Sequence, residues 1–334
     1  MPAIRPTAVA GRFYPGEATA LAAEVAAYLA EAAPGPKGAV APKAIIAPHA
    51  GYMYSGAVAG SIYARLAPLA GKVRRVVLAG PAHRVYVRGA AIPAARAFSS
   101  PLGAVELDAE ALDALRALAF VEVSDAAHAL EHSLEVHLPF LQAVLGSFRL
   151  VPVVVGDCSP RQAQQLFDAV WGGEETLVVV SSDLSHYLPY EAGRARDRET
   201  AGAILGLEPR LVPEEACGAA PINGLLATAR ARGLAAELVD LRSSGDTAGD
   251  RDRVVGYGAF AFHAPGNAMG DEADRGAVLV AIAREAIGRE AAGIEFCLPI
   301  PGDGPAWLRK PGASFVTLRL AGELRGCIGS IEAR

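Results

Sequence analysis

The sequence has few of the residues that mark several common classes of protein. Aromatic residues make up 6% of its 334 positions, and it contains four cysteines. The cysteines show no CxxC spacing, so neither a disulfide framework nor a structural zinc site is indicated. With so few aromatic side chains, a stacking platform for single-stranded nucleic acid is not expected either.

Long apolar runs and blocks of like charge are also missing. Hydrophobic residues make up 52% of the chain, yet no run reaches the roughly 18 residues that a membrane-spanning helix needs. Acidic and basic residues are interspersed at a net charge of −5, which leaves no basic stripe for nucleic acid. The first residues, MPAIRPTAVAGRFYPGE, lack the apolar core of a signal peptide. We therefore expect a cytoplasmic protein that binds neither membranes nor nucleic acid.

Short apolar runs closed by turn residues predict buried strands, and periodic patterns between them predict helices. The strands are expected at 44–47, 73–79, 150–155, 176–180, 236–241 and 254–262. The helices are expected at 17–32, 57–66, 108–119, 133–145, 160–170, 194–205 and 214–232. Continuous apolar strands that alternate with helices predict an α/β fold, a three-layer α/β/α sandwich with a mostly parallel central sheet.

The composition changes after residue 263. Residues 264–274 (APGNAMGDEAD) are small and polar, which is typical of a linker. Beyond them a helical pattern at 275–291 and the strand-like segment SFVTLRLAGELRGCIGSIEAR follow. We therefore expect one large domain at 1–263, a linker at 264–274, and the truncated start of a second, α+β domain at 275–334.

Histidine and aspartate residues follow four of the predicted strands. His49 and His83 follow the first two strands, Asp183 and His186 follow the strand at 176–180, and Asp246 follows the strand at 236–241. Ligands of parallel α/β sheets bind beyond the carboxyl ends of the strands. These side chains are therefore expected to share one edge of the sheet.

Two imidazoles and one carboxylate, from His49, His83 and Asp246, suit a non-haem Fe(II) centre with open positions. Three protein ligands with a water molecule would equally suit catalytic zinc. His186 would then act as an acid or base, since the pKa of histidine lies near neutrality. For each residue a structural role stays open: His49 and His83 as turn residues, Asp183 as a helix cap, and Asp246 as a loop residue.

Four further residues are candidates for contacts to a metal ligand or a substrate. In EHSLEVHLPF, His132 or Glu135 would orient a ligand histidine, or Ser133 would cap a helix with Glu135 in its first turn. Cys217 is either an inert buried cysteine or a reactive thiol, although no cationic neighbour in the sequence supports the second role. Tyr54 would either position an aromatic ligand or pack the rim of the pocket.

Six motifs of this sequence resemble the MEMO family over about residues 1–263. They are AGRFYP at 10–15, PHAGYMYS at 48–55, GPAH at 80–83, EHSLEVHLP at 131–139, SSDLSHY at 181–187 and SSGD at 243–246. The resemblance implies a fold similar to the class III extradiol dioxygenases. Those enzymes bind Fe(II) through two histidines and a carboxylate and use a further histidine as acid or base.

By position, His49 and His83 match the two family histidines, and His186 matches the histidine near the open side of the site. Asp246 stands where animal MEMO proteins carry a cysteine. A thiolate at that position would favour copper or redox chemistry, whereas a carboxylate favours the dioxygenase pattern. The resemblance therefore implies one transition metal ion, with Fe(II) expected and zinc or copper as alternatives.

The tail resembles the beginning of the AMMECR family domain through LRGCIGSIEA and the preceding FVTLRLAGE. The two families occur fused or side by side in prokaryotes together with a radical-SAM protein, as the AmmeMemoRadiSam system. A radical-SAM protein is therefore an implied partner.

Three hypotheses of function follow. The first is a redox or dioxygenase-type enzyme in which His186 moves a proton. The second is a non-enzymatic module that carries a metal or binds a partner, and that acts with the radical-SAM protein. The third is a hydrolase that depends on Zn²⁺.

Overall fold

The computed structural model describes residues 4–33, 40–264, 282–283, 287, 315–320 and 323–329. Its contacts divide the chain into two units, Met1–Ala268 and Met269–Arg334. The predicted linker lies outside the described residues apart from Ala264, and so does most of the predicted helix at 275–291. In the second unit the description covers an antiparallel hairpin of β13 (Phe315–Leu320) and β14 (Glu323–Gly329).

A nine-stranded sheet forms the centre of the first unit. The strand order is β10-β12-β2-β9-β3-β8-β4-β7, and β11 also pairs with β12. The strands are β2 (Ala44–Ala47), β3 (Arg75–Pro81), β4 (Ala90–Ile92), β7 (Val121–Val123), β8 (Arg149–Val155), β9 (Thr176–Ser181), β10 (His186–Leu188), β11 (Ala235–Ser243) and β12 (Val254–His263). The four central strands β2, β9, β3 and β8 run parallel, and β12 joins them in antiparallel orientation. The predicted α/β class with a mostly parallel sheet is therefore confirmed.

Continuous apolar sequence places the parallel strands in the core. All four residues of β2 and all six of β9 are buried, and Ile45 and Ile46 expose none of their surface. Burying one such side chain stabilises the fold by about 1.5–3 kcal/mol. Strands covered on both faces need no polar side, which is why these runs show no alternation.

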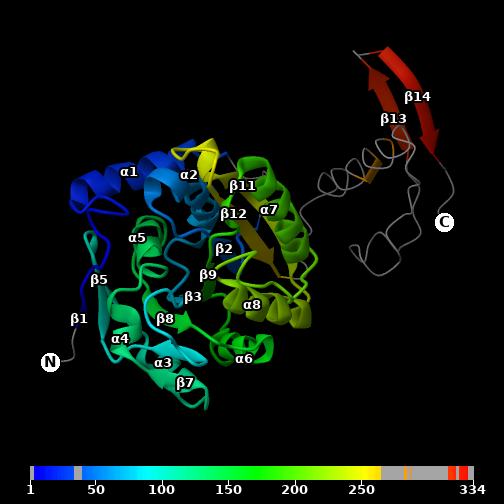
Figure 1. Cartoon of the computed structure of the whole chain (residues 1–334). Coiled ribbons are helices and arrows are strands. Elements are labelled where there is room, and N and C mark those ends of the chain that lie inside the picture. Colours follow the sequence, from blue (N-terminus) through cyan, green and yellow to red (C-terminus); the bar gives the residue numbers. More distant parts are fainter. Residues whose placement is uncertain are drawn as a thin grey trace. The chain divides into compact units, whose positions relative to one another are not determined.

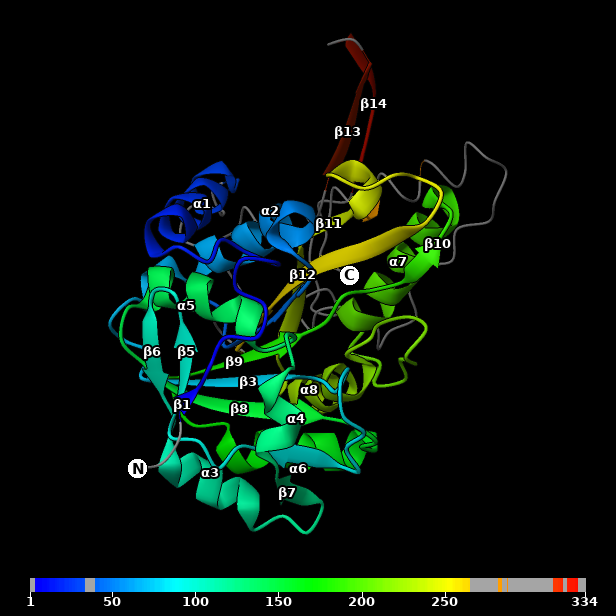
Figure 2. The same ribbon diagram turned by 60° about the vertical axis from the view of Figure 1, so that its left-hand side comes forward.

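Helices cover both faces of the sheet (Figures 1 and 2). One face carries α1 (Ala18–Glu31), α2 (Tyr52–Tyr63) and α5 (Leu138–Leu145), and the other carries α6 (Pro160–Val170), α7 (Tyr190–Leu205) and α8 (Ala219–Arg232). The three predicted layers are thus present. A separate small sheet pairs β1 (Ile4–Arg5), β5 (Ala97–Ser100) and β6 (Gly103–Glu106). Short elements complete the unit: α3 (Ala109–Arg116), α4 (Asp125–Ala129), η1 (Ala64–Leu69), η2 (Glu135–His137) and η3 (Ser244–Asp246).

The helix predicted at 214–232 begins five residues later, at Ala219. The backbone N–H of Cys217 donates to the carbonyl of Asp183. The N–H of Gly218 donates to the hydroxyl of Ser182. These bonds tie the segment before α8 to the end of β9, so it cannot continue the helix toward its N-terminus. Within the described ranges, no helix is both long and apolar enough to span a bilayer.

Candidate metal centre

Three loops that leave the parallel strands bring polar side chains to one edge of the sheet. His49 follows the last residue of β2 by two positions, His83 follows β3 by two, and Asp183 follows β9 by two. They line a cavity of about 720 Å³ together with His132, His186 and Cys217. The carboxyl edge of a parallel sheet is where such a cavity is expected.

Three imidazoles gather in this cavity. One ligand nitrogen from each of His49, His83 and His132 lies within 4.8 Å of the other two. The rings of His83 and His132 stack at 4.8 Å, and the ring of His49 stands edge-on to both. Two metal–nitrogen bonds of about 2.1 Å span at most about 4.2 Å, so a small movement would close the three rings on one ion. The group can therefore hold a metal ion.

Hydrogen bonds orient two of the rings toward the cavity. The Ser181 hydroxyl donates to the carbonyl of Ser133 and therefore accepts from Nδ1 of His49, 2.6 Å away. Nδ1 of His83 lies 3.0 Å from Oε1 of Glu131, a carboxylate that can only accept. Each Nδ1 therefore carries the proton, and each Nε2 keeps the lone pair that a metal requires.

Glu131 organises this side of the site. Its carboxylate accepts from the backbone N–H groups of His83, His132 and Ser133 as well as from the His83 ring. Burial raises the pKa of Glu131, but the bonds from His83 and Ser133 outweigh burial and hold this pKa at about 2. The motif EHSLEVHLPF predicts this orienting role for His132 or Glu135. In the sequence, the one feature that points to Glu131 is that it directly precedes His132.

The third ring of the group, that of His132, is neutral and has one buried nitrogen without a hydrogen-bond partner among the described residues. Its Nδ1 is buried and has no hydrogen-bond partner among the described residues, although Oε1 of Glu131 lies 3.4 Å away. Burial lowers the pKa of His132 to about 4, so the ring is neutral at pH 7. A neutral imidazole keeps a lone pair on one of its ring nitrogens, which a metal ion can bind. The donors present, three imidazoles, suit zinc, copper, iron and nickel.

Asp183 and His186 add two titratable groups to the cavity. Oδ1 of Asp183 accepts from the backbone N–H of His49, and Oδ2 lies 4.0 Å from Nε2 of His49. Burial raises the pKa of Asp183 to about 7. Nδ1 of His186 lies 2.8 Å from the carbonyl of Leu184, and burial lowers the pKa of His186. Asp183 was predicted either as a helix cap or as a site residue. No helix begins beside it, and its carboxylate accepts from His49 instead.

Cys217 lies against the same ring of His49. Its Sγ is 3.3 Å from Nε2 of His49 and 3.6 Å from the carbonyl of Asp183. Burial, and then the charge of Asp183, raise the pKa of Cys217 to about 12. The thiol is therefore protonated in the free protein. Burial lowers the pKa of His49 well below 6.5, so this ring is neutral and supplies no cation to activate the thiol.

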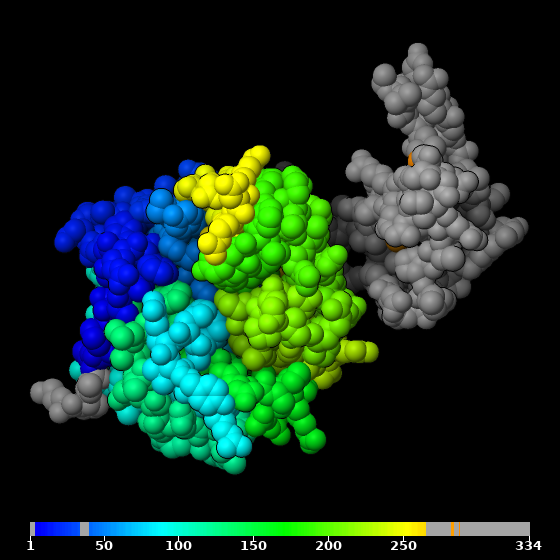
Figure 3. All heavy atoms as spheres, in the orientation of Figure 1, coloured from blue at the N-terminus to red at the C-terminus, as the bar shows by residue number. Residues whose placement is uncertain are grey.

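Asp246 makes its contacts elsewhere. One of its carboxylate oxygens accepts from the hydroxyl of Tyr190, and the other accepts from the N–H of Ser243 at 2.9 Å. In Figure 3 the segment around Asp246 (yellow) lies against the start of α7 (green) at the surface. Asp246 is not among the residues that line the cavity, and the third residue in the group is His132.

Glu135 and Tyr54 also contact other parts of the unit. Buried Glu135 pairs with Arg5 and accepts from the hydroxyl of Tyr14 and the N–H of Val9. Tyr54 packs against the hydrophobic core and does not line the cavity. Ser133, predicted as a helix cap, donates to the carbonyl of Pro81 instead.

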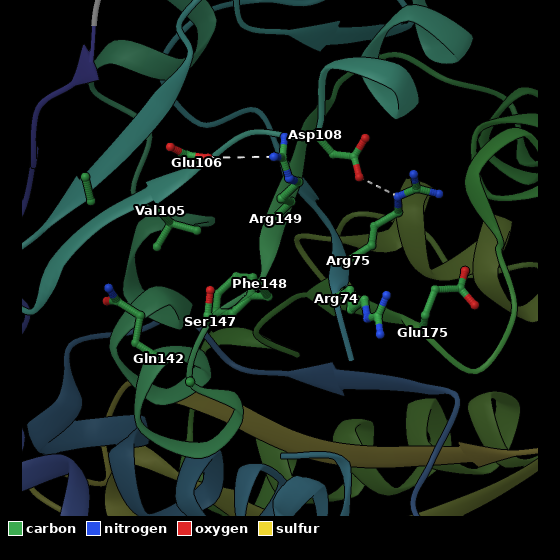
Figure 4. Close-up of a pocket in the computed structure, with 12 residues that line it drawn as sticks. Arg74, Arg75, Val105, Glu106, Asp108, Gln142, Ser147, Phe148, Arg149 and Glu175 are labelled. Carbon is green, nitrogen blue, oxygen red and sulfur yellow. Dashed lines mark hydrogen bonds and ion pairs between the residues drawn. The ribbon is translucent and has the colours of Figure 1, made fainter. Parts of the chain in front are cut away.

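A second cavity, of about 600 Å³, lies at the amino-terminal edge of β3 and β8 (Figure 4). Arg75 in this cavity is bonded to Asp108 at 2.7 Å, and Arg149 lies 4.0 Å from Glu106. Among the described residues that line this cavity, no three side chains form a group that could hold a metal ion. The candidate site is therefore the cavity with the histidines.

Known proteins resemble this chain over both parts. Residues 5–261 match the family model described as Memo-like protein, and residues 280–334 match that of AMMECR1. A MEMO1 family protein of Ignicoccus hospitalis is 37% identical, over 78% of this chain and 99% of that protein. Those of Methanopyrus kandleri and Aquifex aeolicus are 35% and 34% identical, over 77% and 78% of this chain and 98% and 99% of their own lengths.

Among solved structures, an uncharacterized protein of Escherichia coli K12 aligns with a TM-score of 0.40 and 16% identity. The alignment covers 64% of this chain and 98% of that one, and at this score it supports no conclusion. The family matches and the identities are decisive by themselves. The chain belongs to the Memo family, and its residues 280–334 match the AMMECR1 family model.

Proposed function

We propose that this chain is a mononuclear metalloprotein whose ion is held by His49, His83 and His132 and faces the cavity. The observation that carries the proposal is the convergence of three imidazoles, two of which are oriented by a hydrogen bond at Nδ1. Three ligands leave positions open for a substrate, as catalytic metal sites require.

We further propose that the site performs oxygen-dependent chemistry of the Fe(II) dioxygenase type on a small substrate. When bound, iron(II) would supply the reducing centre that oxygen chemistry needs and would polarise a coordinated substrate. Asp183 lines the cavity, and one of its carboxylate oxygens lies 4.0 Å from Nε2 of His49. The Asp183 carboxylate would give the site both histidine and carboxylate groups, and Asp246 would not be needed.

The chain's own residues would move the proton. His186 lines the cavity, and its Nδ1 faces the Leu184 carbonyl, which leaves Nε2 to accept or deliver a proton at the substrate. Asp183, with its pKa near 7, exchanges a proton close to neutral pH and would complete the transfer to solvent. Glu131 and Ser181 would keep the two rings aligned throughout.

Metal analysis after anaerobic purification tests the proposal. We expect one transition metal per chain, lost in the double variant His49→Ala/His83→Ala and retained in the control His263→Ala. His263 pairs with Glu237 and does not line the cavity. Equal metal content in the double variant and the wild type would refute the centre.

The third ligand is tested by comparing two single variants. If His132 is the third ligand, His132→Ala lowers metal affinity by about tenfold or more, while Asp246→Ala leaves the affinity unchanged. The reverse result would restore Asp246 as the ligand predicted from the sequence.

An oxygen electrode with the iron-loaded protein and a panel of catechols tests the chemistry. We expect oxygen uptake that depends on substrate and falls about 10²–10⁴-fold in His186→Ala, because general acid–base catalysis contributes that much. No uptake at full iron loading would favour a module that carries metal or binds a partner.

The donor set also favours a second candidate, a zinc-dependent hydrolase. Three histidines and one water form a known catalytic zinc site, and no carboxylate belongs to the group of three rings. Zinc at one equivalent together with hydrolysis of a test ester would support this candidate. Zinc loading without hydrolysis would exclude it.

A further inference from the structure

We infer that the cavity takes a small aromatic acid, whose carboxylate pairs with Arg84 and Arg196 and whose ring lies against Tyr187. This inference names the class of substrate, and it rests on the proposed metal function. It starts from three side chains that line the cavity but take no part in holding the ion or moving the proton. All three are exposed, so a ligand that enters from solvent meets them.

Two arginines line the cavity from distant parts of the chain. Arg84 directly follows His83, and Arg196 lies on α7. Among the described residues of the lining, the one exposed carboxylate is that of Glu214. A bound metal ion would add further positive charge. The cavity therefore favours an anion, although the whole chain has a net charge of −5.

Both guanidinium groups are available to a ligand. None of the ion pairs between described residues includes Arg84. Arg196 has a loose partner, since its Nη1 lies 4.0 Å from Glu215, which also accepts from the N–H of Val212. Burial is the main cause that lowers the pKa of His132, and the charge of Arg84 lowers it further. The guanidinium of Arg84 is thus close enough to the imidazoles to act on a ligand of the ion.

The backbone at Tyr187 has a conformation that side chains disfavour. Its φ is +61°, in the left-handed region. β10 pairs with β12 through His186 with Val255 and Leu188 with Val254, and the register shifts between these two pairs. Tyr187 is therefore the extra residue of a bulge. Bulges beside active sites re-aim a side chain, and strained residues gather at ligand sites.

The ring of Tyr187 is oriented although it is largely in solvent. The residue is 63% exposed. Its ring centroid lies 5.7 Å from that of His186, and the guanidinium of Arg253 lies 5.0 Å from it. The ring is thus placed beside the group that we propose moves the proton. An oriented aromatic ring offers a surface on which a planar ring packs, so we expect an aromatic substrate.

An aromatic acid satisfies these features together. One end of such a molecule would face the ion and His186, its ring would lie against Tyr187, and its carboxylate would pair with the arginines. Pairs of guanidinium and carboxylate form short, charge-assisted hydrogen bonds. The cavity of about 720 Å³ is within the range of sites for small molecules.

Calorimetric titration of the zinc-loaded full chain tests the inference without oxygen chemistry. The probes are protocatechuate, a dihydroxybenzoate, and the neutral amide of the same molecule. We expect the acid to bind about tenfold more tightly or better, because the acid alone forms charge-assisted bonds with the arginines. In the double variant Arg84→Gln/Arg196→Gln this preference should fall by about tenfold.

The matched control for the arginines is Arg161→Gln. Arg161 is exposed on α6 and does not line the cavity, so this variant should keep the preference for the acid.

Tyr187→Gly tests the ring, because glycine accepts the left-handed backbone that this position requires. We expect the affinity for protocatechuate to fall about three- to tenfold, and Tyr187→Phe to restore the lost affinity. If Tyr187→Gly bound protocatechuate like the wild type, the role of the ring would be wrong.

Zinc analysis of each sample separates this inference from the proposed function. A wild-type chain that binds no zinc would overturn the proposed function together with the inference. With one zinc ion bound, equal affinity for the acid and the amide, or no binding of either, would overturn the inference alone and leave the three-histidine centre standing. A preference for the acid that survives in the double arginine variant would also overturn it.

Discussion

At the scale of single residues, the orientation of the metal centre depends on side chains that would not themselves touch a metal. Glu131 accepts from His83, His132 and Ser133, and Ser181 holds His49. Partners of this kind fix the tautomer and angle of a ligand ring. Replacing them should change metal affinity while leaving the ligands in place.

Glu131→Gln tests this expectation. An amide cannot accept from as many donors as a carboxylate, so the ring of His83 loses its firm orientation. We expect metal affinity to fall about 10–100-fold, as measured by competition with a chelator. The control is Glu174→Gln at an exposed position of the chain, which should bind like the wild type. Unchanged affinity in Glu131→Gln would contradict the orienting role.

A buried ion pair between Arg5 and Glu135 fastens the N-terminal segment. Both residues are buried, and Arg5 also donates to the carbonyls of His128 and Glu131. Arg5→Met leaves a buried carboxylate without its partner. We expect a loss of about 3–5 kcal/mol in the free energy of unfolding, measured by urea denaturation.

The matched control is Arg116→Ala, which removes an exposed pair with Asp113. It should change stability by no more than about 0.5 kcal/mol. If both variants lost the same amount, burial of the Arg5 pair would not be the cause.

At the scale of elements, two glycines in neighbouring helices should respond to alanine in opposite directions. Gly233 ends α8 with φ +67°, the left-handed conformation that side chains disfavour. Gly202 lies inside α7, and a Cβ there would meet no atom within 4 Å. We expect Gly233→Ala to lower stability by about 1 kcal/mol and Gly202→Ala to raise it by about 0.5–1 kcal/mol.

Thermal and urea unfolding of the two variants measure the change in the free energy of unfolding that each substitution causes. A change of the same sign in both would show that backbone conformation does not decide the outcome.

At the scale of the whole molecule, stability should fall toward acid pH because the fold buries neutral histidines. Burial lowers the pKa of His128 to about 4 and that of His137 to about 3, from the ordinary value of 6.5. The unfolded state therefore binds protons first, so this stability is complete above pH 6.5 and is lost as the pH falls through the folded values.

Asp183 and Asp197 act in the opposite direction, since burial raises the pKa of both, to about 7 for Asp183, but they are two groups against several histidines. For the metal-free protein we expect a lower urea midpoint at pH 4.5 than at pH 7.5. His128→Gln should reduce the difference between the two midpoints. A midpoint at pH 4.5 equal to or above that at pH 7.5 would contradict the role of the buried imidazoles.

Much of the fold was predictable because strand and helix signals are local. The apolar run at 44–47 coincides with β2, and the helix at 160–170 coincides with α6, which starts at a capping box. Short strands such as β4 and β7 were not predicted, because three residues are too few to show a strand pattern. The start of α8 was misplaced because hydrogen bonds to β9 decide it, and β9 is distant in the sequence.

The sequence by itself determined which residues follow the parallel strands, and a parallel sheet brings its strand ends to one edge. His49, His83, Asp183 and His186 line one cavity, whereas Asp246, predicted at the same edge, does not line it. Tertiary structure alone decided that His132 joins them, that Glu131 aligns His83, and that Cys217 faces His49. These three lie in loops or turns outside the parallel strands, and their positions depend on packing between distant segments, which no local pattern encodes.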